Sequence, residues 1–385
     1  MFRKTVVKAV RLAQLLVTVW AASATESLKR RAKALEIRLD GLNTGLEIKP
    51  LTEVPFPDLD LESLANPVVA ILESPEFKKT SRFFYDNPVA ARSLISANAQ
   101  ALLYAVVRNL KPHHVFEIGT YKAGTTEAIC RALCANGHGI LHTVDPFQAE
   151  YVSAVLKHWP SKLIDHVRLY PMDSMAFYKE KEREGVHPDL VFVDGNHDYE
   201  FALFDIARGG RYLTRGGFIF VDNVAQAGPF FAALDFLAAN SGWQNLKVSN
   251  RPYDLTKSFD RERTTIPDTD FIVLRAPKTY SVDARPKNFG RTRWWSETLS
   301  GIALKFAPNN VSGVLNVQVV FRGFGIQPAE VVEGTTIELK EGATEISVQL
   351  PIKLAGRQFI YRTVEPWLIW QGSQALELLE PPTPF

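Results

Sequence analysis

Residues 113–136 read HHVFEIGTYKAGTTEAICRALCAN, an apolar run that enters a glycine-containing loop and then a helical pattern. The run Val115–Ile118 is nearly all apolar, as a parallel strand covered on both faces should be. Four later runs share this texture, and helix-length segments such as Thr126–Ala135 and Phe201–Leu213 lie between them. The four runs are Ile140–Val144, Val167–Leu169, Leu190–Val193 and Phe218–Val221. This βαβ alternation predicts an α/β fold with an open, doubly wound, mostly parallel sheet.

The composition is that of an ordinary globular protein. The chain has 385 residues, of which 46% are hydrophobic and 22% charged, so disorder, collagen-like repeats and a disulfide scaffold are excluded. Its two cysteines, Cys130 and Cys134, fit neither a metal knuckle nor a secreted framework, and they favour a reducing, cytoplasmic compartment. A net charge of +2 gives no overall attraction to nucleic acid. We therefore expect binding at a local site.

The N-terminal segment is basic and contains a short apolar stretch. Residues 12–24 are too short to cross a bilayer, which takes about 20 residues. Three interpretations stay open. The segment is a helix packed on its own protein or on a second copy in a homo-oligomer. Alternatively, residues 1–33 rest peripherally on an anionic membrane surface, or a signal peptide is cleaved after Ala22-Ser23-Ala24.

The regions on either side of the α/β segment have different textures. Before it, residues 41–62 indicate a linker, and Leu64–Leu72 and Val89–Leu110 predict helices. After the five runs, Leu246–Val248 and Phe271–Leu274 could close the sheet, and the polar stretch between them could form a lid over a site.

The C-terminal part predicts a separate all-β sandwich. Its predicted strands are Gly313–Phe321, Thr335–Leu339, Glu345–Leu350 and Phe359–Tyr361, with one helix over Ser373–Leu379. Its tryptophans could offer aromatic platforms to a saccharide, although core packing is the commoner role; they are Trp294, Trp295, Trp367 and Trp370. The chain therefore divides into an N-terminal helical and linker extension over 1–87, the α/β domain over 88–275 and a β-rich accessory domain over 276–385.

Ligands of doubly wound sheets bind outside the carboxyl ends of the strands, so the residues that follow each strand are the candidates. The first run leads into the loop Glu117–Thr126, where glycines allow close approach of a ligand and a helix N-terminus offers free N–H groups. The loop lacks the G-x-G-x-x-G spacing of dinucleotide sites and the GK[ST] ending of phosphate loops, which counts against NAD and against a nucleotide triphosphate.

Carboxylates follow the second and third runs. Asp145 ends the second run, where it could accept both hydroxyls of a ribose or cap the next helix. Asp173 and Ser174 follow the third, where they could reach an adenine ring or, again, cap a helix.

The fourth and fifth runs end in Asp194 and in Asp222-Asn223. If these strands are neighbours, two carboxylates and an amide oxygen meet at one edge, a donor set that suits Mg²⁺. Ordinary strand-end caps without metal are the alternative. His197 lies three residues beyond Asp194, where it could accept a proton near neutral pH or simply bond to a neighbouring carboxylate.

Together these motifs resemble the class I S-adenosylmethionine-dependent methyltransferases, and among them the metal-dependent, catechol-type and bacterial family-24-type O-methyltransferases. The resemblance covers about residues 88–275 and depends on the 117–126 loop, Asp145, VFVDGNH at 191–197 and LTRGGFIFVDN at 213–223. It implies a Rossmann-like, seven-stranded sheet whose last strand is antiparallel. Ala123 stands where a glycine is common in the family, and we expect the methyl group to be tolerated.

The resemblance also assigns roles to residues. S-adenosyl-L-methionine would lie against Glu117, Gly119, Thr120, Tyr121, Gly124, Thr125, Asp145, Asp173 and Ser174. Asp194, Asp222 and Asn223 match the metal triad of the catechol-type enzymes, and His197 stands where those enzymes carry a basic lysine. The expected reaction is transfer of a methyl group to a hydroxyl of a small molecule or saccharide, assisted by Mg²⁺ or another divalent cation and by His197 as the base. A non-catalytic, S-adenosylmethionine-binding scaffold or regulatory protein is the alternative.

Overall fold

The structure is a computed structural model, and it describes residues 59–86, 94–240, 242–247, 270–289, 292–293, 301–308, 311–323, 330–349 and 362–384. The interpretations of residues 1–33, of most of the 41–62 linker and of a lid between the last two strands of the sheet lie outside these residues. No helix within the described ranges is both long enough and apolar enough to cross a membrane.

The α/β region is built on a seven-stranded sheet with the order β3-β2-β1-β4-β5-β7-β6. The strands are β1 His114–Ile118, β2 Ile140–Val144, β3 Val167–Tyr170, β4 Leu190–Val193, β5 Phe218–Val221, β6 Gln244–Lys247 and β7 Ile272–Arg275. Strands β1 to β5 are parallel, and β7 runs antiparallel to both β5 and β6. The predicted fold class and the antiparallel last strand are therefore confirmed.

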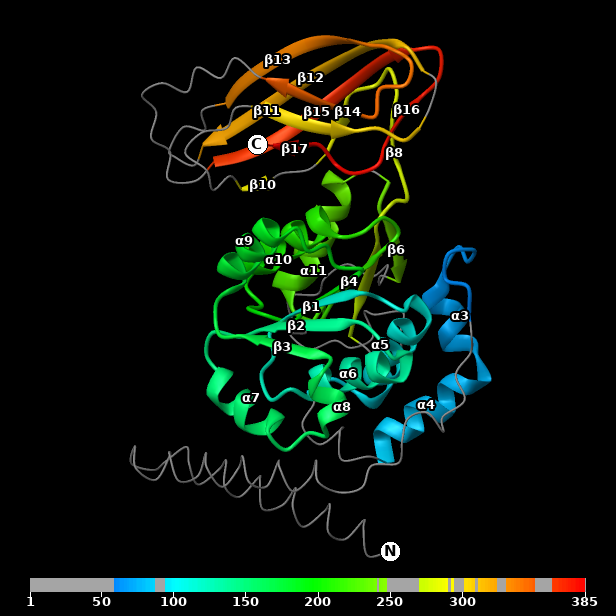
Figure 1. Ribbon diagram of the computed structural model, residues 1–385, viewed down its shortest axis with the longest axis vertical. Coiled ribbons are helices and arrows are strands. Elements are labelled where there is room, and N and C mark those ends of the chain that lie inside the picture. Colours follow the sequence, from blue (N-terminus) through cyan, green and yellow to red (C-terminus); the bar gives the residue numbers. More distant parts are fainter. Residues whose placement is uncertain are drawn as a thin grey trace, which may run out of the picture.

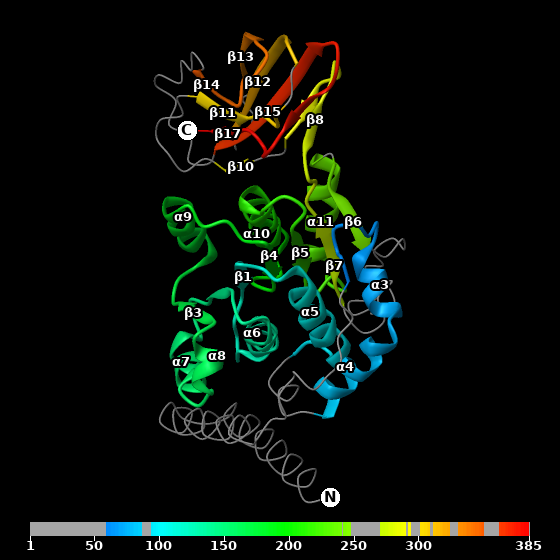
Figure 2. The ribbon, with the colours of Figure 1, turned by 45° about the vertical axis from the view of Figure 1, so that its right-hand side comes forward.

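Helices cover both faces of this sheet (Figures 1 and 2). One face carries α3 Pro67–Glu73, α4 Pro75–Asp86, α5 Ala97–Leu110, α6 Gly124–Asn136, α7 Ala149–Leu156 and α8 Ser161–Ile164; the other carries α9 Ser174–Glu184, α10 Tyr199–Tyr212 and α11 Ala227–Ala239. Strand side chains alternate between the two cores: Phe192 packs into the first core and Val191 and Val193 into the second. Burial on both faces explains why the central strands β4 and β5 are apolar throughout.

Backbone hydrogen bonds continue across the carboxyl ends of the parallel strands. The Asp145 N–H donates to the Tyr170 carbonyl at 3.1 Å, and the Asp194 N–H donates to the Ile118 carbonyl at 2.9 Å. The Asp222 N–H completes the row by donating to the Val193 carbonyl at 3.0 Å. The residues that follow β2, β4 and β5 are thereby fixed side by side along one edge.

Gly119 is required at this edge for steric reasons. It has a φ of +96°, and a Cβ atom there would lie 2.0 Å from the Asp194 carbonyl oxygen. A side chain would therefore push the end of β1 away from the end of β4. The glycine was predicted to allow close approach of a ligand, but the close approach in the structure is that of the neighbouring strand.

Two predicted helices in the flanking regions are corrected. The helix predicted over Val89–Leu110 begins, within the described residues, at Ala97, because the Ser96 side chain accepts a hydrogen bond from the Ala99 N–H and caps it. Helix α4 was not predicted at all. The segment Ser373–Leu379 was predicted to be a helix and instead contains the strand β16, Leu376–Leu378, in which two buried leucines flank the half-buried Glu377 with a period of two.

After Arg275 the described chain forms only strands, which pack as several small sheets (Figure 1). The strands are β8 Tyr280–Val282, β9 Lys287–Asn288, β10 Thr292–Arg293, β11 Gly301–Lys305, β12 Gly313–Gly323, β13 Glu330–Leu339, β14 Glu345–Gln349, β15 Arg362–Gly372, β16 and β17 Thr383–Pro384. They enclose their own hydrophobic core, and Trp370, 1% exposed, belongs to it. Trp294 and Trp295, and the strand predicted over Phe359–Tyr361, lie outside the described residues.

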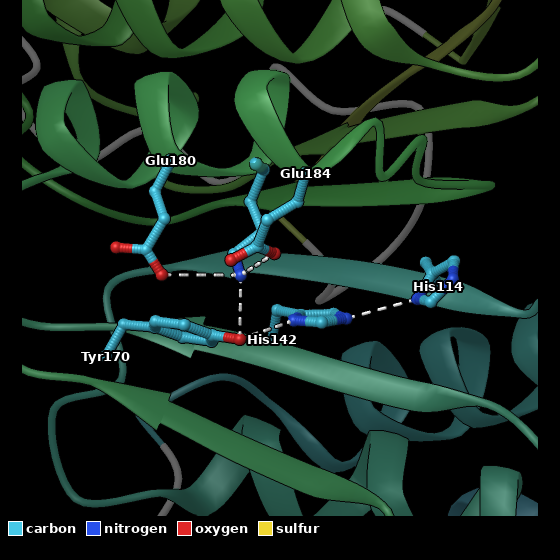
Figure 3. A network of polar contacts seen from close by, with 6 residues as sticks. His114, His142, Tyr170, Glu180 and Glu184 are labelled. Carbon is cyan, nitrogen blue, oxygen red and sulfur yellow. Dashed lines mark hydrogen bonds and ion pairs between the residues drawn. The ribbon is translucent and has the colours of Figure 1, made fainter.

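A buried polar network lies between the first three strands and α9 (Figure 3). His114 Nδ1 is 3.1 Å from His142 Nε2, and His142 Nδ1 is 3.0 Å from the Tyr170 hydroxyl. Lys181 donates to that hydroxyl at 2.9 Å and forms an ion pair with Glu184 at 2.6 Å. Burial, followed by the positive charge of Lys181, lowers the pKa of His142 to about 4. His142 is therefore neutral in the folded protein at neutral pH.

We predict that this histidine makes the fold less stable in mild acid. Between its ordinary pKa of 6.5 and the folded value of about 4, the unfolded chain binds a proton at His142 that the folded chain does not. The free energy of unfolding should therefore fall as the pH falls through this window, with a slope of at most about 1.4 kcal/mol per pH unit from this residue. Urea unfolding of the wild type and His142→Gln at pH 7.0, 5.5 and 4.5 measures it. Equal slopes for both proteins would contradict the prediction.

Candidate functional site

A cavity of about 800 Å³ opens at the carboxyl ends of the parallel strands. Nine of the thirteen residues predicted from the sequence line it, namely Gly119, Tyr121, Asp145, Asp173, Ser174, Asp194, His197, Asp222 and Asn223. They come from the segments that follow β1 to β5, as the strand-end argument requires. Residues that are far apart in the sequence thus share one cavity.

The other four predicted residues lie behind the cavity wall. Glu117 is fully buried, its Oε2 accepts a hydrogen bond from the Thr126 hydroxyl at 2.7 Å, and burial raises its pKa to about 8. The Thr120 hydroxyl is 2.5 Å from the Thr143 hydroxyl. Gly124 and Thr125 begin α6 and are also buried. These contacts hold the loop after β1 from behind, and a direct role in ligand binding stays a prediction for these four residues.

Backbone strain is concentrated around the cavity. Five non-glycine residues in the described ranges have a positive φ, and four of them belong to the loop after β1 or to the cavity wall: Tyr121 (+47°), Ala123 (+61°), Asn223 (+57°) and Asp270 (+52°). Each such conformation costs of order 1–3 kcal/mol and persists where the surroundings impose it. The left-handed conformation of Ala123 gives a physical reason for the glycine that is common there in the family.

The Asp145 carboxylate organises the two loops beside it. Its Oδ2 accepts a hydrogen bond from the Tyr121 N–H at 2.9 Å, and its Oδ1 accepts from the N–H groups of Phe147 and Gln148 at 2.8 and 2.9 Å. These bonds close the turn before α7 and do not cap that helix, whose N-cap residue is Gln148 and has no side-chain cap. Oδ1 already accepts two hydrogen bonds, whereas Oδ2 accepts one and retains further acceptor capacity, so a ribose hydroxyl could still bond to Oδ2 and the ribose role stays a prediction.

The third strand end shows a similar division of roles. Asp173 Oδ1 accepts a hydrogen bond from the Ala176 N–H at 2.8 Å and caps α9, so the capping alternative holds at this strand end. The Ser174 hydroxyl bonds instead to the carboxyl group of Asp205 on α10.

The residues after β4 and β5 form an acidic cluster with one histidine. Asp194 Oδ1 accepts a hydrogen bond from the Asn223 side-chain amide at 2.9 Å and lies 3.5 Å from His197 Nε2. Burial raises the pKa of Asp194. The pKa of Asp222 is raised well above its usual range, mainly by burial and secondly by the negative charge of Asp194. The hydrogen bond to Asp194 raises the pKa of His197. Two buried carboxylates that oppose each other's ionisation are stabilised by a proton or a cation.

The donor set fits a hard divalent cation. Two carboxylates and an amide oxygen are ligands that Mg²⁺ prefers, with water and substrate oxygens completing the coordination. As arranged, the Asn223 NH₂ group faces Asp194, so binding through its oxygen requires the amide to turn over. Among the described residues, no group of three or more His, Cys, Asp or Glu side chains is arranged to hold a metal ion. A metal ion at this cluster would therefore depend on Asn223 as the third ligand.

Several cavity residues were missed by the sequence argument. Asp270 precedes β7, and since β7 is antiparallel its beginning lies at the same edge as the ends of the parallel strands; that signal could have found it. Asp205 sits within α10, where strand ends give no indication. Leu94, Phe147 and Phe201 line the cavity with more than half of their side-chain surface exposed, and offer apolar surface to a ligand.

Comparisons with known proteins agree with this architecture. Residues 116–224 match the family model described as a methyltransferase domain. No curated protein matches the chain.

Several solved structures are similar to part of the chain. The O-methyltransferase from Bacillus cereus in complex with SAH is 15% identical, and the match covers 55% of this chain and 96% of that one with a TM-score of 0.39. TomG is the O-methyltransferase from Streptomyces achromogenes involved in tomaymycin synthesis, and its structure was solved with SAM. It is 17% identical, and the match covers 57% of this chain and 95% of that one with a TM-score of 0.38. A methyltransferase from Geobacter sulfurreducens is 17% identical, and the match covers 55% of this chain and 89% of that one with a TM-score of 0.35.

The family model covers the segment from β1 to the residue after Asn223, which holds the loop after β1, Asp145 and the acidic cluster. The resemblance derived from the sequence motifs is therefore confirmed for this segment. Residues 116–224 of the chain are thus similar to a methyltransferase domain.

Proposed function

We propose that this protein is an S-adenosylmethionine-dependent O-methyltransferase that acts with the help of a divalent cation. One observation carries the proposal: a single cavity joins the loop after β1 and Asp145 to the cluster of Asp194, Asp222, Asn223 and His197. A methyl donor at the first group and a hydroxyl acceptor at the second would be neighbours within that cavity. Alignment of two reactants in this way supplies roughly 7–11 kcal/mol in favourable cases.

The cofactor end of the cavity is formed by residues that the loop holds in place. Asp145 would accept a ribose hydroxyl with the Oδ2 lone pair that its three backbone bonds leave over. Tyr121 and Phe147, both partly or largely exposed at the cavity, would cover the ligand. The bound sulfonium supplies an activated methyl group, so the protein's task is orientation and removal of one proton.

The acidic cluster would bind the cation and prepare the acceptor. Asp194, Asp222 and Asn223 would hold it, and there it would lower the pKa of a bound hydroxyl and fix its direction. His197, 36% exposed and facing Asp194, would accept the proton of the acceptor hydroxyl. Asp194 orients the imidazole and favours its protonated form, since it raises the pKa of His197.

The acceptor that fits this arrangement is a small molecule or saccharide that carries a hydroxyl, preferably with a second oxygen beside it. Two adjacent oxygens can occupy neighbouring positions on one cation. Leu94 and Phe201, whose side chains are 81% and 54% exposed, would contact the apolar part of such a molecule.

We predict that S-adenosylhomocysteine binds the folded protein with micromolar affinity, and that Asp145→Asn weakens binding roughly 10- to 100-fold. The loss corresponds to one hydrogen bond to a charged group. Isothermal titration calorimetry measures both values. Asp198→Asn is the matched control, because Asp198 is exposed and lies outside the cavity wall. Wild-type protein that is folded but binds nothing would refute the proposed function.

Removal of divalent cations should abolish methyl transfer, and added Mg²⁺ should restore it. Asp194→Asn should lower the rate by at least about 100-fold, because a cation contributes several kcal/mol to such reactions. The assay uses methyl-labelled S-adenosylmethionine with a panel of phenols and vicinal diols that includes catechol. Full activity in the presence of a chelator would exclude the cation, while cofactor binding without any transfer would favour a non-catalytic scaffold.

Replacement of His197 by Gln should lower kcat by roughly 10²–10⁴-fold, the usual contribution of a general base. The KM for the acceptor and the affinity for S-adenosylhomocysteine should change little, since the glutamine fills similar space. His158→Gln, at an exposed position outside the cavity wall, serves as the control. An unchanged kcat in His197→Gln would assign the proton transfer to another group.

A further inference from the structure

The Gln226 side chain contacts two members of the acidic cluster. Its Nε2 donates a hydrogen bond to Asn223 Oδ1 at 3.4 Å. The hydrogen bond to Asp194 is the largest cause that raises the pKa of His197, and a side-chain hydrogen bond to Gln226 raises it further. A contact that raises the pKa of a histidine stabilises its proton, so Gln226 acts as an acceptor toward the imidazole. Gln226 therefore links the candidate third ligand of the cation to the candidate base.

These contacts close a ring of four side chains. Asn223 Nδ2 donates to Asp194 Oδ1 at 2.9 Å, and the same oxygen lies 3.5 Å from His197 Nε2. Gln226 completes the ring through its contacts with Asn223 and His197. In such a network each side chain is held by two others, so the loss of one member loosens the rest. A change at Gln226 is therefore transmitted to His197.

The place of Gln226 in its helix also indicates a role in this ring. Gln226 is the N-cap residue of α11, and its side chain makes no capping hydrogen bond. The residues preferred at N-caps are Ser, Thr, Asp, Asn and Gly, because their side chains or backbones satisfy the first N–H groups of the helix. The glutamine side chain bonds to the acidic cluster instead of to its own helix.

The backbone brings the start of α11 close to His197. The Gln226 N–H donates to the Asn223 carbonyl at 2.9 Å and closes the turn that follows β5. Gly228, two residues further on, lies against the loop after β4, since a Cβ atom there would lie 2.0 Å from the His197 carbonyl oxygen. A glycine at this position therefore allows the close packing that places Gln226 beside the imidazole.

The proposed reaction makes two demands on Asp194. As a ligand of the cation it would use a carboxylate that now faces His197 and Asn223. The imidazole then needs another acceptor, because the hydrogen bond made by one ring nitrogen decides which nitrogen carries the proton. Gln226 is such an acceptor and is not among the candidate ligands. Its amide carries both donors and an acceptor, so it can keep a bond to Asn223 whichever way that amide is turned.

We propose that Gln226 is a positioning residue for His197, and that it holds the imidazole in the tautomer whose other nitrogen is free to accept the proton of the acceptor hydroxyl. The inference rests on the proposed function, because it requires His197 to act as the base. Gln226 does not line the cavity. It therefore acts through His197 and not by contact with a ligand.

The first test observes the tautomer directly and needs no acceptor molecule. The full chain is labelled with ¹⁵N-histidine, and the ring signals of His197 are identified by their loss in His197→Gln. Spectra are recorded with Mg²⁺, at a pH above which these signals no longer move. Gln226→Met, which has a similar length but lacks the amide, should change the ratio of the two tautomers roughly 3- to 10-fold, the value of one hydrogen bond. Gln244→Met, at an exposed position outside the cavity wall, should leave it unchanged.

A second variant separates this role from helix capping. Gln226→Ser places a preferred capping residue at the start of α11, so it should not lower the thermal stability, but its side chain is too short to reach His197. It should change the tautomer ratio as Gln226→Met does, and it decides the question if Gln226→Met does not fold. A wild-type ratio in a folded variant of either kind overturns the inference.

The third test is a double-mutant cycle on methyl transfer at saturating Mg²⁺. Gln226→Met should lower kcat roughly 3- to 10-fold and leave the affinity for S-adenosylhomocysteine unchanged. Gln226→Glu, which keeps an acceptor, should restore most of kcat. In the His197→Gln background, Gln226→Met should have no further effect, since no imidazole is left to position. Equal losses in both backgrounds overturn the inference and leave the proposed function intact, whereas a wild type without methyl transfer refutes both.

Discussion

The structure depends on how closely the ends of β1 and β4 approach each other. Gly119 leaves room for the Asp194 carbonyl oxygen, and the Asp194 N–H donates to the Ile118 carbonyl at 2.9 Å. This contact fixes the distance between the loop proposed to bind the cofactor and the cluster proposed to bind the acceptor. The bonds of the Asp145 and Asp222 N–H groups extend the same row to β3 and β5. The relative positions of the candidate site residues therefore follow from backbone geometry, which is stiffer than side-chain contact.

Around this row the protein keeps groups in states that would be unfavourable elsewhere. Tyr121, Asn223 and Asp270 have left-handed backbones, and burial raises the pKa of Glu117 and of Asp205. The two cores, which bury both faces of β4 and β5 and most of β1 and β2, provide the stability that tolerates these costs. Strained backbone conformations and shifted pKa values are thus concentrated at the edge where ligands of doubly wound sheets bind, which is typical of functional sites.

Most of the sheet could be predicted, because runs of apolar residues separated by helix-length segments indicate where each strand lies. The runs Ile140–Val144, Leu190–Val193 and Phe218–Val221 match their strands to the residue, since burial on both faces leaves an unbroken apolar signal. Helix α4 has local signals that the sequence argument overlooked, since it begins with Pro75 and carries Glu76 in its first turn. Strand β16 was missed because its pairing with β8, rather than local preference, decides it. Nine site residues were located at the cavity by the strand-end rule. That rule does not apply to residues within helices, so it could not find Asp205 on α10. It placed Glu117 at the cavity, whereas the hydrogen bond from Thr126 that holds Glu117 in the interior cannot be inferred from the sequence.

The direction of β7 has a consequence for the architecture of the whole chain. Because β7 is antiparallel to β5, it begins beside the cavity at Asp270 and delivers the chain to the opposite edge at Arg275, which pairs with Phe218 at the start of β5. The β-rich unit is attached there, and none of the described residues beyond Asp270 lines the cavity. The described strands after Arg275 are thus joined to the sheet away from the cavity, and Arg211 of α10 donates a hydrogen bond to the Pro382 carbonyl at 3.1 Å.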